Sequence, residues 1–169
     1  MTFNRNRILP LILSAVIIVA DQITKAAIVA KIDLYSIGAS FGGDLLRIIH
    51  TRNPAVAFSL GHSLPPQIRT VLFIVLPLIV LGAVLVFFLR SDDFTTAQRW
   101  AVAAVIGGGL GNLIDRIFRP MGVVDFVDVK FFGIFGLERW PTFNVADAAV
   151  VVGGLLLAVT LLLPQKKSS

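Results

Sequence analysis

The sequence has no cysteine and only two histidines, and charged residues make up only 15% of it. Neither disulfides nor thiolate chemistry is therefore available, and His50 and His62 do not match a metal-binding spacing such as H-E-x-x-H. We expect no metal, no cofactor and no redox centre. The net charge of +5 is spread along the connecting segments. Anionic lipid headgroups explain such a distribution better than a nucleic-acid partner does.

The sequence is instead rich in hydrophobic residues, which make up 56% of the chain. Four segments of about 20 residues are long enough to cross a hydrocarbon core about 30 Å thick. The predicted spans are roughly residues 8–30, 68–90, 97–118 and 143–164. The first is too long for a signal peptide and lacks an A-x-A cleavage pattern, so we expect it to be a permanent helix. The predicted class is a mainly α integral membrane protein of one domain, residues 1–169.

Two of the three connections, 31–67 and 119–142, are long, half apolar and on the same side of the membrane. The alternating stretches "LLRIIH" and "VVDFVDVKFF" within them predict short strands or interfacial segments. We expect residues 36–60, whose glycines permit bending, to cap a site from outside.

Basic residues predict the orientation of the chain. Six of them crowd very short segments on one side, where the positive-inside bias acts most directly. Eight lie on or near the other side, mostly on the long loops. We therefore expect both termini in the cytoplasm and the long loops outside. The first group is Arg5, Arg7, Arg90, Arg99, Lys166 and Lys167, and the second is Lys31, Arg47, Arg52, Arg69, Arg116, Arg119, Lys130 and Arg139.

Polar side chains of the spans should gather at one membrane face. Such groups are costly in lipid and mark either a site or polar contacts that hold a bundle together. Since successive spans run in opposite directions, polar groups late in the first and third spans and early in the fourth meet on the side of the long loops. They are Asp21, Asn112, Asp115, Asn144 and Asp147, and the loops can add Asn53, Asp125 and Asp128.

Spacing separates structural roles from chemical ones. Asp21 and Lys25 are four residues apart with the acid first, which favours an ion pair within one helix. Asp115 and Arg116 are adjacent and cannot face each other, so each needs another partner. The small residues Gly107 and Gly111 predict a close contact between helices.

A pair of aspartates is the strongest candidate chemistry in this polar layer. Two carboxyls a few ångströms apart cannot both ionise cheaply, so one can act as an acid while the other activates water. A serine activated by Lys25 is an alternative, although no serine lies in a G-x-S-x-G context. The serines are Ser14, Ser36, Ser40, Ser59 and Ser63.

Four motifs, "DQITK" (21–25), "GGGLGNLIDR" (107–116), "VVDF" (123–126) and "FNVAD" (143–147), together resemble the bacterial lipoprotein signal peptidases, or signal peptidase II. The resemblance implies four transmembrane helices, a small extracytoplasmic β-cradle with an interfacial segment, and a place in the inner membrane. It also implies an aspartic endopeptidase that cleaves prolipoproteins just before a diacylglyceryl-modified cysteine, with water as nucleophile. Cyclic peptides of the globomycin type would inhibit it, and we expect a monomer.

The resemblance also implies residue roles. Asp125 and Asp147 would be catalytic, and Asn53, Asn112, Asp115, Arg116 and Asn144 would support them and hold substrate. In a strand, Asp125 and Asp128 point to opposite faces, so only one can enter the site, and the resemblance selects Asp125.

The chain departs from the family pattern in one place. Ala55 in "NPAVAF" stands where the family pattern N-x-G-x-A-F has glycine, so the backbone after Asn53 is expected to differ.

Two other functions fit the same composition. A small proton-coupled transporter also places carboxylates in a helix bundle, but it needs a path from both sides, whereas the charges here crowd one face. A non-enzymatic assembly factor would need the aspartates only for packing.

Overall fold

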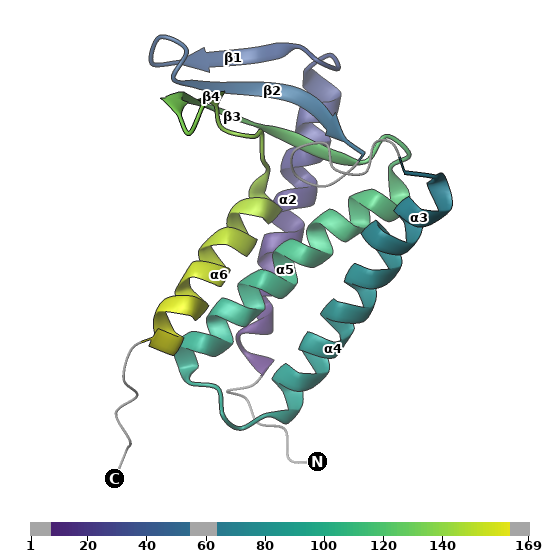
Figure 1. Cartoon of the computed structure of the whole chain (residues 1–169), viewed down its shortest axis with the longest axis vertical. Coiled ribbons are helices and arrows are strands. Elements are labelled where there is room, and N and C mark those ends of the chain that lie inside the picture. The colour runs from purple at the N-terminus through teal and green to yellow at the C-terminus, as the bar shows by residue number, and fades with distance from the viewer. Residues whose placement is uncertain (1–7, 55–63, 163–169) are drawn as a thin grey trace.

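The protein is described by a computed structural model over residues 8–54 and 64–162. Within these ranges four helical segments are long and apolar enough to cross a membrane: Leu11–Lys31 (α2), Pro66–Arg90, Thr96–Phe118 (α5) and Val145–Leu162 (α6). They agree with the four predicted spans to within a few residues. Figure 1 shows the four spans as a bundle with a small sheet at one end.

The second span is not one regular helix. It comprises α3 (Pro66–Thr70), a π-helical turn (Val71–Val75) and α4 (Leu76–Arg90). Pro77 has no N–H and its ring would clash with the carbonyl four residues earlier, and a wider turn at that point relieves the clash. The sequence analysis did not predict this irregularity.

Helix α5 is the most buried span, and small residues let its neighbours approach closely. A β carbon added to Gly107 would lie 2.8 Å from Cα of Ser14 in α2. One added to Gly111 would lie 2.9 Å from Asp21 Oδ2 and 3.2 Å from Cβ of Ala146 in α6. The predicted close contact at these two glycines is therefore confirmed, and it involves both α2 and α6.

The sheet contains both predicted strand regions. Its strands are β1 (Ile37–Phe41), β2 (Leu46–Asn53), β3 (Val123–Ile134) and β4 (Leu137–Arg139), antiparallel in the order β1-β2-β3-β4. The predicted cap spans residues 36–60. Up to Asn53 it consists mainly of the β1–β2 hairpin. Its later part, including Ala55, lies outside the described residues.

Pairing of the strands and of the segment before α6 brings distant polar residues together. Asp125 lies opposite Thr51 of β2. Phe143 exchanges backbone hydrogen bonds of 3.0 and 2.8 Å with Val127 of β3. Because Phe143 directly precedes Asn144 and the start of α6, this bridge places the beginning of the last span beside the strand that carries Asp125.

Candidate active site

Five of the predicted site residues line one cavity of about 1140 Å³ at the sheet end of the bundle. Asp125 comes from β3 and Asp147 from the first turn of α6. Asn112 and Arg116 come from α5, and Asn53 comes from the end of β2. The fold therefore gathers residues from four separate elements at the place that the sequence analysis expected.

Asn144 connects the two aspartates. Its side-chain Nδ2 donates to Asp125 Oδ1 at 2.7 Å, and its backbone N–H donates to Asp147 Oδ2 at 3.2 Å. In return Asp147 N–H donates to Asn144 Oδ1 at 2.9 Å. This reciprocal pair is a capping box at the start of α6, with an aspartate in place of the usual glutamate. The same residues that begin the helix thus orient both carboxyls.

Asn112 holds Asp147 from the other side. Its Nδ2 donates to Asp147 Oδ1 at 2.7 Å, while its Oδ1 accepts from Lys25 Nζ at 2.9 Å and from Asn144 Nδ2 at 3.1 Å. An ammonium group can only donate, so Lys25 requires the amide oxygen to face it. The amide nitrogen of Asn112 is then directed at Asp147.

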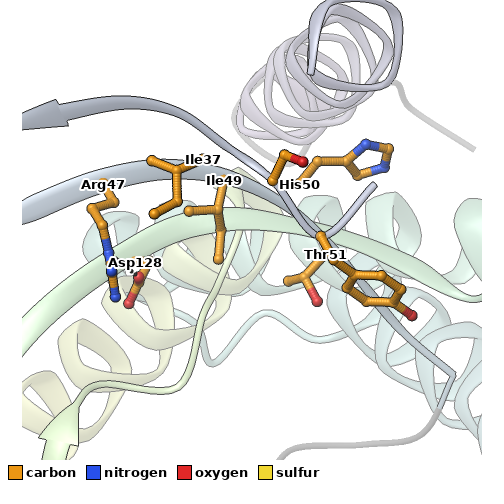
Figure 2. A pocket seen from close by; sticks show the side chains of 8 residues that line it. Ile37, Arg47, Ile49, His50, Thr51 and Asp128 are labelled. Carbon is orange, nitrogen blue, oxygen red and sulfur yellow. Dashed lines mark hydrogen bonds and ion pairs between the residues drawn. The ribbon is translucent and has the colours of Figure 1, made fainter. Parts of the chain in front are cut away.

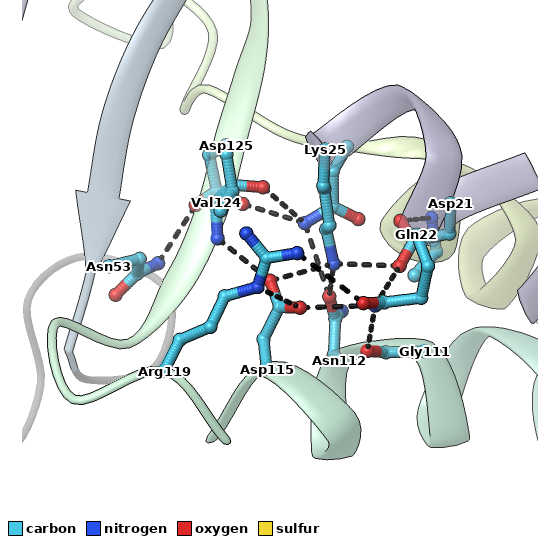
Figure 3. A network of polar contacts seen from close by, with 12 residues as sticks. Asp21, Gln22, Lys25, Asn53, Gly111, Asn112, Asp115, Arg119, Val124 and Asp125 are labelled. Atoms are coloured by element: carbon cyan, nitrogen blue, oxygen red, sulfur yellow. Dashed lines mark hydrogen bonds and ion pairs between the residues drawn. The ribbon is translucent and has the colours of Figure 1, made fainter. Parts of the chain in front are cut away.

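Lys25 is completely buried and lies next to Asn112 in this network (Figure 3). Its ammonium contacts Asp21 Oδ2 at 2.8 Å, Asp115 Oδ2 at 3.2 Å and Asn112 Oδ1 at 2.9 Å. The predicted ion pair between Asp21 and Lys25 is confirmed. With its three N–H groups directed at these partners, Lys25 is not positioned to activate a serine.

The serine alternative gains no support in the part of the chain that the structure describes. Ser14, the buried serine of α2, donates to Ala103 O at 2.6 Å instead of facing Lys25. Ser59 and Ser63 lie outside the described residues.

Asp115 joins α5 to both α2 and the sheet (Figure 3). Its Oδ1 accepts from Gln22 Nε2 at 3.0 Å and pairs with Arg119 Nε at 3.1 Å, and its Oδ2 accepts from Val124 N–H at 3.0 Å. Asp115 therefore finds partners other than Arg116, as predicted. The sequence analysis missed Gln22 and Arg119, although Gln22 is polar within a span and Arg119 is four residues from Asp115.

Arg116 and Asn53 complete the polar part of the cavity. Asn53 Nδ2 donates to Asp125 Oδ2 at 3.3 Å, so both oxygens of Asp125 are engaged. Arg116 lines the cavity. Among the described residues no carboxylate forms an ion pair with Arg116, whereas the nearby Arg119 is paired with Asp115. A guanidinium in this position is available to a ligand.

The remaining cavity walls are mostly apolar. They extend from the aspartates along α4, α5 and α6 to about two helical turns from the start of α6. The apolar wall residues are Leu76, Pro77, Val80, Leu81, Val105, Val123, Trp140, Pro141, Phe143, Val150, Val151 and Val152. A polar centre with long apolar walls suits a substrate that is itself largely apolar.

Asp128 lies away from this cavity, in a separate pocket of about 200 Å³ with Arg47, Ile37 and Ile49 (Figure 2). Its carboxylate accepts from Arg47 Nε at 2.8 Å and Arg139 Nε at 2.6 Å. Only one of the two β3 aspartates therefore reaches the large cavity, and it is Asp125.

Burial and, after it, the nearby charge of Asp147 raise the pKa of Asp125, hydrogen bonds from Asn144 and Asn53 lower it, and the net result is a pKa of about 7. Near neutral pH the Asp125 carboxyl therefore holds a proton for part of the time. This is the condition in which one carboxyl of a pair can donate a proton while the other accepts one.

Among the described residues there is no cluster of three or more His, Cys, Asp or Glu side chains that could hold a metal ion.

The chain is similar to known proteins over nearly its whole length. The model of the signal peptidase (SPase) II family matches residues 13–163. The chain is 44% identical over 166 residues to the lipoprotein signal peptidase of Treponema pallidum, covering 98% of this chain and 89% of that protein. It is 45% identical over 170 residues to the one of Borrelia duttonii, covering 100% of this chain and 99% of that protein.

Two solved structures of bacterial membrane enzymes have the same fold. One superimposes with a TM-score of 0.77 at 27% identity, covering 91% of this chain and 87% of the other. The second has a TM-score of 0.77 at 26% identity, covering 95% and 94%.

Proposed function

Because this chain belongs to the signal peptidase II family, we propose that it is a multi-pass bacterial inner-membrane endopeptidase that removes signal peptides from prolipoproteins. The observation that carries the proposal is the pair Asp125 and Asp147, held by one asparagine in a cavity with apolar walls. Neither a transporter nor an assembly factor is supported by these relatives.

In the proposed reaction Asp125 carries the shared proton and Asp147 is the base. Asp147 accepts hydrogen bonds from Asn112 and from the backbone of Asn144, both of which stabilise a carboxylate. It removes a proton from water as the water attacks the scissile carbonyl, and Asp125 protonates the carbonyl oxygen. Asp147 then gives its proton to the leaving amine while the ionised Asp125 takes a proton back from a hydroxyl of the tetrahedral intermediate. The C–N bond breaks, the carboxyl end of the signal peptide separates from the new amino terminus, and both aspartates return to their starting states.

The substrate proposed for this site is a precursor whose cysteine carries diacylglycerol. Acyl chains anchored in the bilayer would hold the scissile bond near the membrane surface, and the two aspartates lie at the sheet end of the bundle. The apolar walls from α4 and α6 would receive the signal peptide and lipid, and Arg116 would donate to backbone carbonyls of the substrate. We place both termini in the cytoplasm and the site near the outer face, and we propose that a monomer acts.

The test is incubation of the purified protein with a diacylglyceryl-modified prolipoprotein, followed by detection of the released signal peptide. Cleavage just before the modified cysteine is expected, with none of the same precursor lacking lipid. A globomycin-type cyclic peptide should block it by occupying the cavity. No release, or equal cleavage of the precursor without lipid, contradicts the proposal.

A further inference from the structure

The turn between β1 and β2 packs against the β3–β4 hairpin at one end of the sheet. Lys130 N–H in β3 donates to Leu45 O in the β1–β2 turn at 2.8 Å. Arg139 Nη1 of β4 contacts the backbone and side-chain oxygens of Asp44 at 3.2 and 3.3 Å. Both hairpins therefore end at the same edge of the sheet, where the β1–β2 turn contacts Lys130 and Arg139 of the β3–β4 hairpin.

This edge exposes large apolar side chains. Phe135 is 90% exposed and Phe132 is 66% exposed. We define the apolar edge as the exposed residues Phe41, Leu45, Phe132, Ile134 and Phe135. The proposed cleavage reaction uses none of them.

In the β3–β4 hairpin two phenylalanines adopt an energetically unfavourable backbone conformation. Phe132 has φ 55° and Phe135 has φ 53°, next to Gly133 at 78° and Gly136 at 77°. A left-handed conformation is unfavourable for a residue with a bulky side chain, whereas glycine or asparagine adopts it more easily. The two rings are therefore held outward in a strained turn that a smaller residue would suit better, which points to a partner outside the chain.

The position of the edge identifies that partner as lipid. Trp140 precedes the start of α6 by five residues, so the chain between them spans at most about 17 Å. The headgroup layer is about 5 to 8 Å deep on each side of the hydrocarbon core, so β4 and its turn begin close to it. Trp140 is itself exposed and packs on Phe131 with ring centroids 4.9 Å apart. Tryptophan is typical of the membrane interface.

Charge at the edge favours the same partner. Lys130 Nζ lies 5.7 Å from the centre of the Phe132 ring, so a cation accompanies the apolar surface. The carboxylate of Asp44 is paired with Arg139 and with Arg47. An ammonium beside exposed rings suits a phospholipid phosphate above acyl chains.

We propose that the apolar edge inserts into the headgroup region of the adjacent leaflet and anchors the sheet to phospholipid. Strand β3 carries Asp125 near one end and Phe132 near the other, so the anchor sets the height of Asp125 above the bilayer. In Figure 1 the β3–β4 hairpin projects to the left beyond the upper end of α6, where that helix begins.

The absence of cysteine allows a direct test. Phe135→Cys provides a single labelling site for an environment-sensitive fluorophore, and Ser40→Cys provides the control. Ser40 is exposed on β1, the strand farthest from β4 in the sheet, and it faces away from Phe41 by strand alternation. Each labelled protein is reconstituted in vesicles of phosphatidylethanolamine and phosphatidylglycerol.

We expect the label at 135 to be quenched by lipid carrying a spin label near the headgroup and to be several-fold less accessible to iodide than the label at 40. Diluting the protein in lipid should leave this shielding unchanged. Equal access of iodide to both labels overturns the proposal. Shielding that disappears on dilution assigns the edge to a second copy and overturns it as well.

A catalytic measurement tests the anchoring role and rests on the proposed function, whereas the labelling does not. The double variant Phe132→Ser, Phe135→Ser should process a vesicle-anchored precursor several-fold more slowly than the unmodified chain. It should cleave a short lipopeptide in detergent at an unchanged rate. Unchanged processing in vesicles would show that the edge does not position the site, and an inactive unmodified chain would instead count against the proposed function.

Discussion

Asn112 donates a hydrogen bond of 2.7 Å to Asp147 Oδ1, and the opposite end of the same amide accepts one from Lys25. The buried ammonium thereby fixes which end of the amide faces the aspartate. Asn144 makes a similar connection between Asp125 and Asp147. The candidate site is thus a layer of two carboxyls supported by amides, which are in turn held by a buried ionic cluster.

Replacing Asp125 or Asp147 with Asn should abolish cleavage without unfolding the protein. Asn retains size and hydrogen bonding but removes the titrating proton, and one acid or base is worth about 10² to 10⁴ in rate. Because the two act as a unit, the double variant should be scarcely worse than either single one. The measurement is release of signal peptide from a lipid-modified precursor.

Asp128→Asn is the matched control, because Asp128 lies on the same strand but pairs with Arg47 and Arg139 away from the cavity. It should keep most of the activity. Substantial turnover by Asp125→Asn or Asp147→Asn would remove the aspartyl mechanism.

The pH profile should reflect the raised pKa of Asp125, which lies near 7. Above this pH the carboxyl loses its proton, so kcat/KM should fall as pH rises through about 7. Asn53 donates a hydrogen bond that lowers this pKa. Asn53→Ala should therefore move the falling limb to higher pH. A shift to lower pH, or none, would mean that Asn53 does not stabilise the charged form of Asp125.

The same pKa predicts a stability effect. A carboxyl whose pKa is higher in the folded state than in the unfolded state stabilises the fold at low pH, and this contribution is lost as pH rises through about 7. Asp125→Asn should therefore make the melting temperature less dependent on pH between about 4 and 8. Thermal unfolding in detergent across this range would detect the change, and a variant with an unaltered pH dependence would contradict the raised pKa.

Arg116→Lys should lower kcat/KM by roughly ten- to a hundredfold, the value of a charged hydrogen bond in a forked geometry that an ammonium cannot reproduce. Arg119→Lys is the control, since Arg119 is partly exposed and a lysine can still pair with Asp115. Wild-type cleavage by Arg116→Lys at normal expression would leave Arg116 with a structural role.

Lys25→Met should destabilise the fold by about 3 to 5 kcal/mol, because it leaves Asp21 and Asp115 buried without their cation. Arg47→Met also removes a partner of a buried carboxylate, but Asp128 keeps Arg139 at 2.6 Å, so a smaller loss of about 1.5 to 3 kcal/mol is expected. The melting temperatures of the two variants in detergent provide the comparison. Equal losses would show that the cluster around Lys25 contributes no more than the single ion pair of Arg47 with Asp128.

Gly111→Ala tests the helix contact next to the site. The added carbon would meet Asp21 Oδ2 at 2.9 Å and Cβ of Ala146 at 3.2 Å, so a loss of about 1 to 3 kcal/mol is expected. Gly154→Ala in α6 meets no atom within 4 Å and should be neutral or stabilising by about 0.5 to 1 kcal/mol. If both substitutions have the same effect on thermal unfolding, the contact at Gly111 is not tight.

The sequence by itself determined the membrane class and the four spans, because hydrocarbon selects long apolar helices whatever their partners are. It also predicted the ion pair of Asp21 with Lys25, since neighbours on one helix follow from spacing. The motifs around Asp125 and Asp147 identified the family. These features depend on local pattern or on the solvent.

The partners of each polar group were decided only by the tertiary structure. The hydrogen bond from Asn144 to Asp125, the amide of Asn112 between Lys25 and Asp147, and the contact of Asp115 with Gln22 join residues of different elements. Spacing along one element does not determine such pairs, because they depend on the rotation and depth of each helix against the others. The outward phenylalanines of the β3–β4 turn likewise appear only once the backbone dihedrals and the neighbouring turn are known.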